Sequence, residues 1–254
     1  MKTQPSGVIL LVIMLLAVSC SVKEDRQDCP CRLMMDMSGI DTALVKVVNL
    51  LATSSDGVVF SDTVSSKDFS RIYMRDVPHT QMRISAWTGD RELIIPYGQE
   101  CPPFYMSSFA ADTHGEVCLC YVDLKKNHCC LTVLFDGRDQ MPYRLTFRGD
   151  VDGYSDDGTP SVGAFACVAY PLSDGSGAQV IVPRQLDSSL LLDVEDVESA
   201  TLKTFAIGEY LTAGGYDWTS ENLDDATVIL DYYVTGIKIT YKGWDKEYSY
   251  DIIL

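Results

Sequence analysis

The sequence predicts an all-β protein in which two tandem antiparallel β-sandwich domains follow an export signal. Apolar residues recur at every second position in many short segments, which is the pattern of half-buried antiparallel strands. These segments follow one another at intervals of about 8–12 residues with turn signals between them, as in sandwiches and barrels. Apolar residues make up 46% of the chain, which is enough to form a core.

The first 19 residues are predicted to be a signal peptide. Lys2 supplies a positive charge, and 7–18 is almost entirely apolar but shorter than the ~20 residues that span a bilayer. Small and apolar residues then lead to a cysteine, which resembles the lipobox of bacterial lipoproteins. That resemblance implies cleavage between Ser19 and Cys20 and attachment of acyl chains, palmitate among them, to Cys20. Residues 20–28 are expected to be a polar tether.

Residues 29–126 are assigned to the first sandwich. Alternation in 32–37 and in 81–86 predicts strands, whereas 41–51 fits either a strand or a short helix. An Asp-Gly pair at 56–57 predicts a tight turn. The next segment carries two alternating sets of residues, Val117, Leu119 and Tyr121 in one and Cys118, Cys120 and Val122 in the other.

Residues 127–254 are assigned to the second sandwich, because 125–128 is the first concentrated basic and polar stretch after the opening strands. The C-terminal end has the clearest pattern, since 227–233, 237–241 and 248–252 predict a three-stranded meander. The other predicted strands lie at 131–135, 143–147, 163–170, 179–182, 190–194 and 201–205.

The chain is strongly acidic, with a formal net charge of −16. Removal of residues 1–19 leaves 235 residues. It also removes the positive charge of Lys2, so the mature chain is more acidic still. A protein of this charge is repelled by nucleic acid and by anionic lipid head groups. The sequence therefore argues against a nucleic-acid partner.

Nine cysteines are present, and eight remain if Cys20 carries lipid. An even number in an exported chain suggests disulfides, although the sequence does not determine their pairing. Neighbours such as Cys129 and Cys130 are poorly placed to bond to each other. Reduced thiols packed in the core are an equally good interpretation. The candidates are Cys29, Cys31, Cys101, Cys118, Cys120, Cys129, Cys130 and Cys167.

The sequence contains no nucleophile elbow, P-loop or dinucleotide-binding motif, so we predict neither an enzyme nor a cofactor. The cysteines of 118–130 do not have the spacing of a zinc ribbon. Asp150, Asp152 and Asp156 offer oxygen ligands for Ca²⁺, but the order of an EF-hand is broken. A solvated hairpin loop is the favoured interpretation of this acidic segment.

Three further features have ordinary structural explanations. The Arg-Gly-Asp tripeptide at 148–150 is expected to be a chance match to an integrin motif. The five carboxylates of 187–198 are expected on a solvated strand and loop. Aromatic residues crowd the C-terminal part, where core packing is the main expectation. A sugar-binding platform that includes Trp218 or Trp244 is the alternative.

Several segments together suggest a family. Cys20 is followed by Asp-Cys-Pro-Cys at 28–31 and a predicted strand, and later come Gly-Glu-Tyr-Leu at 208–211 and Ala-Gly-Gly-Tyr-Asp-Trp at 213–218. With the closing strands of 237–253, this combination resembles the FimB-like fimbrial anchor lipoproteins of Bacteroidia-type bacteria. The resemblance covers the whole chain, is strongest at its two ends, and implies two transthyretin-like sandwiches.

The resemblance implies a lipid-anchored base subunit that attaches a surface fimbria to the outer membrane and influences its assembly and length. The implied partners are the membrane, through the lipid on Cys20, and a fimbrial shaft subunit, and the implied location is the cell surface. Two alternatives stay open. One is a surface lipoprotein that binds a glycan or a host protein through an aromatic patch, and the other is a hydrolase with a carboxylate pair.

Overall fold

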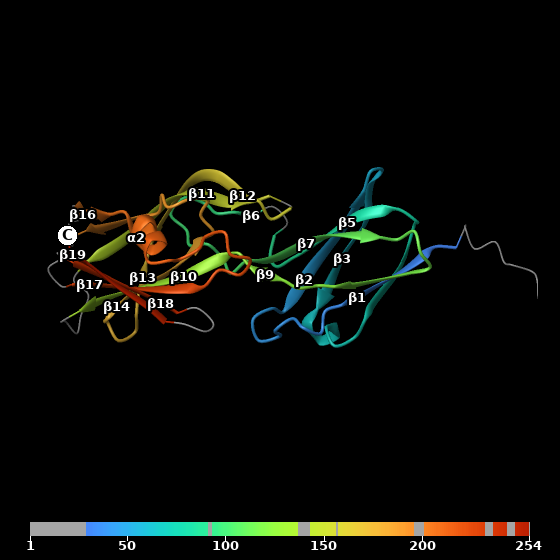
Figure 1. Ribbon diagram of the computed structural model, residues 1–254, viewed down its shortest axis with the longest axis horizontal. Helices are drawn as coiled ribbons and strands as arrows, with labels where there is room; N and C mark the ends of the chain where they lie inside the picture. The colour runs from blue at the N-terminus through green and yellow to red at the C-terminus, as the bar shows by residue number, and fades with distance from the viewer. Residues whose placement is uncertain are drawn as a thin grey trace, which may run out of the picture.

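The alternating segments form two β-domains that follow one another along the long axis of the molecule (Figure 1). The predicted signal peptide, Cys20 and the predicted tether lie outside the residues whose structure is described. The computed structural model describes residues 29–90, 93–136, 143–155, 157–195, 201–231, 236–242 and 247–253.

Two sheets form the first domain. One has the order β4-β1-β8 and consists of β1 (Cys31–Asp36), β4 (Tyr73–Val77) and β8 (Val117–Tyr121). The other has the order β3-β2-β5-β7-β9 and consists of β2 (Val47–Ser54), β3 (Gly57–Ser65), β5 (Gln81–Trp87), β7 (Tyr105–Asp112) and β9 (Lys125–Lys126). A short 3₁₀ helix, η1 (Ser66–Asp68), follows β3. Leu33, Leu50 and Ile84 are fully buried in the common core.

The predicted strands and turn of this domain are confirmed. In 41–51, which the sequence left open, β2 begins only at Val47. The preceding turn is closed by the Val45 N–H, which donates to the Asp41 carbonyl at 2.9 Å. The predicted turn at 56–57 joins β2 to β3, and its glycine has φ of 115°, a value that residues with a side chain rarely adopt.

Strand β8 presents its thiols to the core. Cys118 and Cys120 pack against the core cluster, whereas Val117, Leu119 and Tyr121 are 59%, 52% and 68% exposed. The cause is the register with β1, in which both cysteines lie opposite buried β1 positions. The more apolar set of this segment therefore faces away from the core.

Two further sheets form the second domain. The first has the order β13-β14-β10-β17-β18-β19 and consists of β10 (His128–Asp136), β13 (Tyr170–Pro171), β14 (Gly177–Pro183), β17 (Asp225–Asp231), β18 (Gly236–Lys242) and β19 (Glu247–Ile253). The second has the order β12-β11-β15-β16, with β6 beside β11, and consists of β6 (Leu93–Ile94), β11 (Arg144–Tyr154), β12 (Pro160–Val168), β15 (Leu191–Glu195) and β16 (Thr201–Phe205).

The C-terminal meander is confirmed, since β17, β18 and β19 pair as antiparallel neighbours. Two other pairings are parallel, β1 with β8 and β10 with β17, which an expectation of antiparallel sheets did not include. Parallel strands need a crossover, and the one before β17 contains a helix that we did not predict, α2 (Ile207–Ala213). By length and hydropathy, none of the helices in the described ranges could span a membrane.

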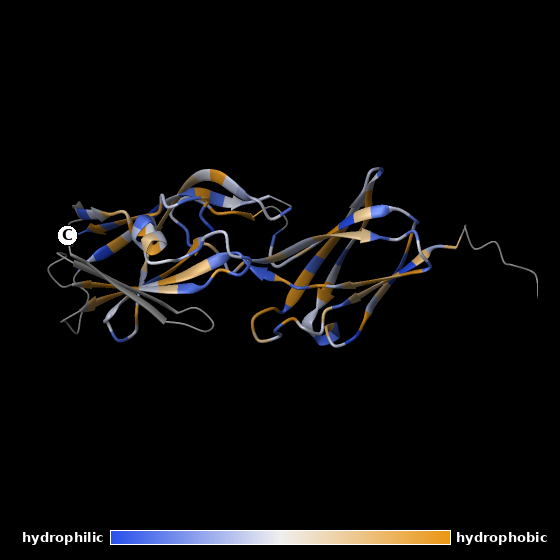
Figure 2. Ribbon diagram, viewed as in Figure 1, coloured by the Kyte–Doolittle hydropathy of each residue, from blue (hydrophilic) through white to orange (hydrophobic). Residues whose placement is uncertain are grey.

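The two domains share one segment of chain. After β5, residues 93–104 leave the first domain, add β6 to the second domain, and place Ile95 and Phe104 in its core before the chain returns as β7. The sheet can accept β6 because residue 153 is a glycine, where a Cβ would overlap the Leu93 carbonyl. Figure 2 shows apolar and polar residues alternating along the strands of both domains.

One guanidinium group joins the linker between the domains to the second domain. Arg184 follows β14 and is half-buried. It donates hydrogen bonds to five oxygen atoms, those of the Asn127 side chain (3.0 Å) and of the Trp218 (2.6 Å), Ser220 (2.7 Å), Glu221 (3.2 Å) and Lys126 (3.4 Å) carbonyls. Since all five acceptors are neutral, the contacts fix geometry and do not neutralise charge.

A tyrosine completes this junction from β11. The Tyr154 hydroxyl donates to the Asn127 carbonyl and accepts from the Arg184 N–H at 2.6 Å. Its ring stacks on Phe104 with 4.8 Å between centroids. The linker is thus held from both sheets of the second domain.

We predict that Arg184→Met lowers the free energy of unfolding by about 3 kcal/mol, because the partly buried carbonyls around it lose their donors. Urea denaturation of the mature protein measures this effect. Arg71→Met is the control, since the Arg71 side chain is 81% exposed, and it should change the value by less than about 0.5 kcal/mol. Equal effects of the two substitutions would contradict a special role for Arg184.

Candidate functional site

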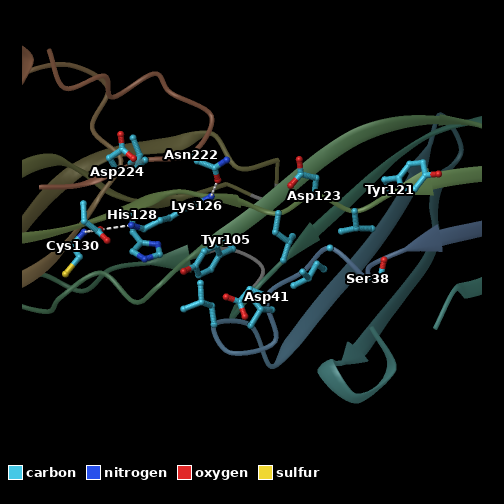
Figure 3. A pocket seen from close by; sticks show the side chains of 18 of the residues that line it. Ser38, Asp41, Tyr105, Tyr121, Asp123, Lys126, His128, Cys130, Asn222 and Asp224 are labelled. Atoms are coloured by element: carbon cyan, nitrogen blue, oxygen red, sulfur yellow. Dashed lines mark hydrogen bonds and ion pairs between the residues drawn. The ribbon is translucent and has the colours of Figure 1, made fainter. Parts of the chain in front are cut away.

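A groove of about 1150 Å³ lies between the two domains (Figure 3). The first domain contributes the loop after β1 and the segment from β8 to β9, and the second contributes the start of β10 and the loop before β17. We call this cavity the interdomain groove. It is lined by Asp36, Ser38, Gly39, Ile40, Asp41, Leu44, Val45, Tyr105, Tyr121, Val122, Asp123, Leu124, Lys126, His128, Cys130, Asn222, Leu223, Asp224 and Asp225.

The wall from the first domain is a tight loop held by its own carboxylates. The Asp36 side chain accepts the Ser38 N–H at 2.8 Å, and the Asp41 side chain accepts the Ala43 N–H at 2.7 Å. The Ser38 N–H lowers the pKa of Asp36, because it stabilises the ionised carboxylate. Beside these acids, Leu44 remains 64% exposed.

The wall from the second domain is built on one ion pair. Lys126 Nζ lies 2.5 Å from Asp225 Oδ1, and the same oxygen accepts the Cys130 N–H at 2.7 Å. The Asn222 side chain accepts the Lys126 N–H at 2.9 Å. Asp225 therefore serves as both counter-ion and backbone acceptor, and the neighbouring Asp224 faces the groove from the same loop (Figure 3).

His128 begins β10 and is 5% exposed. Its Nδ1 lies 3.1 Å from both the backbone nitrogen and the carbonyl oxygen of Phe104, and that carbonyl also accepts the Asn127 N–H at 3.0 Å. Both contacts of Nδ1 are with the backbone of Phe104, which therefore fixes the orientation of the ring. Burial lowers the pKa of His128 to about 4, so the ring is neutral at pH 7. Tyr105 packs edge-on against it, with 5.1 Å between ring centroids.

The groove has an excess of negative charge. Five aspartates and one lysine are among its lining residues, and the lysine is paired with Asp225. Asp123 is paired with Lys125 at 2.6 Å. In the described part of the chain, no ion pair engages Asp36, Asp41 or Asp224. Burial raises the pKa of Asp224, because its charge is partly desolvated.

We did not identify the groove from the sequence, because its walls come from segments that are distant along the chain. The acidic pair at 224–225 is the one local signal that could have suggested it. The predicted cleavage point between Ser19 and Cys20, and the predicted lipid site at Cys20, lie outside the described residues, as does Trp244.

The eight remaining cysteines have free thiols and occupy three environments. Cys118 and Cys120 have sulfurs 3.7 Å apart, which is contact and not a bond. Burial raises the pKa of the Cys120 thiol to about 12. Cys29 is exposed, Cys118, Cys120 and Cys130 are half-buried, and Cys31, Cys101, Cys129 and Cys167 are buried.

The acidic segment after Phe147 is mostly strand, not loop. Asp150 and Asp152 belong to β11, and only residues 155–159 connect β11 to β12, so the expected hairpin loop is shorter than predicted. Asp156 lies outside the described residues. Within those residues, no group of three or more His, Cys, Asp or Glu side chains is arranged to hold a metal ion.

The Arg-Gly-Asp tripeptide is also part of β11. Arg148 Nε lies 2.5 Å from Asp193 Oδ2 in an ion pair across to β15. Asp193 is only 7% exposed, so the prediction that the carboxylates of 187–198 are solvated is wrong at this residue. The alternation of β15 places Asp193 beside Arg148, whose pairing stabilises the buried charge.

The expectation of core packing is confirmed for the aromatic residues at 216 and 218. Tyr216 is 4% and Trp218 5% exposed, and their rings meet edge-on with 4.7 Å between centroids. The alternative hypothesis, in which Trp218 is part of an exposed platform, is therefore wrong for this residue. The loop that contains it packs inward because its carbonyls bind Arg184.

No family model and no curated protein matches the chain. Solved structures share its fold at low sequence identity. A candidate polysaccharide-binding protein from Bacteroides thetaiotaomicron superposes with a TM-score of 0.68 and 13% identity, covering 87% of this chain and 98% of that chain. A candidate adhesin from Bacteroides ovatus has a TM-score of 0.62 and 13% identity, covering 87% and 96%.

The fimbrial anchor protein Mfa2 from Porphyromonas gingivalis is also among the structural neighbours. Its TM-score is 0.59 at 13% identity, with 85% of this chain and 98% of that chain covered. The predicted all-β fold, and its likeness to fimbrial proteins, are thereby confirmed.

We predict that His128 makes folding stability depend on pH. In the unfolded chain a histidine takes up its proton near pH 6.5, whereas in the fold this happens only near pH 4. The contribution is therefore fully present above pH 6.5 and is lost as the pH falls toward 4, by roughly 3 kcal/mol in total. Urea denaturation across this range should show the loss, and His128→Gln should lack it.

Phe104→Leu is the control for this prediction. It removes the Phe104 ring that stacks on Tyr154 but keeps the titrating histidine and its backbone partner, so it should lower stability by a similar amount at each pH. A stability slope that is the same in His128→Gln and in the parent protein would contradict the assignment.

Proposed function

We propose that this chain is a subunit of a surface fimbria, held at the base of the fibre by lipid on Cys20. The observation that carries the proposal is the fold shared with the fimbrial anchor protein Mfa2 over most of both chains. The structural neighbours are a fimbrial anchor protein, a candidate polysaccharide-binding protein and a candidate adhesin, which also supports a role without enzymatic activity.

The course of the chain supports attachment through its N-terminus. The described part begins at Cys29, and β1 runs from there to Asp36, which lines the interdomain groove. The start of β1 therefore lies at the end of the molecule away from the second domain (Figure 1). A lipid on Cys20, nine residues before Cys29, would leave the first domain next to the membrane and the second domain further out.

The partner that we propose is a fimbrial shaft subunit. Open sheets have unpaired backbone groups at their edge strands, and strand addition uses these groups for binding. In the second domain the order of the larger sheet ends at β19, close to the end of the chain. This edge lies in the domain that the proposed orientation directs away from the membrane.

Cys20→Ala in the native cell tests the proposal. We expect the protein and the fibres to shift from the cell-bound fraction to the medium, because the lipid supplies the membrane affinity. Immunoblots of both fractions and electron microscopy of the fibres measure this. Cys29→Ala, which removes the next cysteine and leaves Cys20 in place, should keep both on the cell.

Two outcomes would contradict parts of the proposal. Retention of the Cys20→Ala protein in the membrane would exclude the lipid anchor. Release of the protein, with fibres absent from both fractions of the parent strain, would leave the lipoprotein assignment intact and exclude the fimbrial role.

A further inference from the structure

The size of the interdomain groove favours a segment of a polymer over a small molecule. Its volume of about 1150 Å³ exceeds the roughly 300–1,000 Å³ that is usual for small-ligand pockets. It lies between two domains, where ligand sites are common, and its walls come from both. The occupant is therefore expected to touch both domains.

The charges of the groove select a cationic occupant. Asp36 and Asp41 from the first domain and Asp224 from the second line it, and no ion pair in the described residues engages them. Asp224 is partly desolvated, and Lys126, the cation whose charge acts on it, forms its ion pair with Asp225, so a positive group in the groove would stabilise the Asp224 carboxylate further. Anionic ligands are repelled from the same site.

The apolar part of the lining selects aliphatic groups between the cations. Leu44 and Tyr121 line the groove and are 64% and 68% exposed, whereas the lining residues Ile40 and Leu223 are nearly buried. Water in contact with such a surface is released when an aliphatic side chain covers it. A small hydrophilic cation would leave this surface uncovered.

The buried histidine requires that the occupant form a hydrogen bond at a defined position in the groove. His128 lines the groove, its Nδ1 is occupied by the Phe104 backbone, and no hydrogen bond joins its Nε2 to another described residue. That nitrogen calls for a polar partner on the occupant, such as a peptide group. An extended polypeptide supplies carbonyls at regular intervals and side chains on both sides.

We propose that the interdomain groove binds an extended segment of another polypeptide in which lysine or arginine alternates with aliphatic residues. The cations lie against the aspartates of both walls, the aliphatic side chains cover Leu44, and a backbone peptide group forms a hydrogen bond with His128 Nε2. This inference is independent of the lipid anchor and of the fimbrial role. A failure here leaves both of them standing.

The test measures binding of a synthetic peptide that alternates lysine with leucine to the detergent-solubilised mature protein, by fluorescence anisotropy at low and physiological salt. We expect saturable binding. Asp41→Asn combined with Asp224→Asn should weaken it roughly tenfold, because one carboxylate is lost from each wall. The asparagine at 41 can still accept the Ala43 N–H, so the loop is expected to keep its fold.

Two matched controls separate the groove from the general acidity of the chain. Asp56→Asn combined with Asp174→Asn changes the net charge equally at exposed residues away from the groove and should leave binding unchanged. Leu44→Ser should weaken binding roughly fivefold, whereas Val58→Ser, at 63% against 64% exposure, should not.

Three outcomes would overturn the proposal. Equal weakening by the two aspartate pairs would mean non-specific attraction to an acidic protein. Equal effects of the two serine substitutions would exclude apolar contact in the groove. Binding of maltohexaose, with no binding of the peptide, would assign the groove to a saccharide instead.

Discussion

The arrangement of the two domains depends on the guanidinium group of Arg184. It donates to oxygen atoms of the interdomain linker, at 126–127, and of the loop that contains Trp218. Lys126 ends β9, whereas Asn127 and the loop residues lie outside the strands, and the Trp218 and Ser220 carbonyls receive their donor from Arg184. A single planar group with five N–H donors meets this need, which lysine could not do in the same geometry. The linker and the loop therefore keep one position relative to each other.

The interdomain groove is a consequence of this junction. Lys126 is bound by the Asn222 side chain through its backbone N–H and by Asp225 through its ammonium group. Along the chain it lies two residues before the start of β10. Because Arg184 and Tyr154 hold the adjacent Asn127, the walls are set by hydrogen bonds outside the groove. Its own lining is free to carry unpaired carboxylates and an exposed leucine.

The alternation of apolar residues predicted individual strands correctly, but it did not predict which domain each segment joins, because the two domains share segments of the chain. Period-two alternation found the strands and the closing meander, because each depends on neighbours in the chain. It did not find α2, a short helix in a crossover between the two sheets. It also missed that 93–104 leaves the first domain to join the second core, since Ile95 and Phe104 are apolar in either location.

The sequence by itself determined the strands, the acidic character and the predicted lipid site at Cys20, because each of these depends on residues that are adjacent in the chain. Only the tertiary structure decided which face of a strand is buried. In β8 both alternating sets are apolar enough to be covered, and the register with β1 turned the half-buried Cys118 and Cys120, instead of Leu119, toward the core. The groove was decided in the same way, since its aspartates meet only when the two domains are packed together.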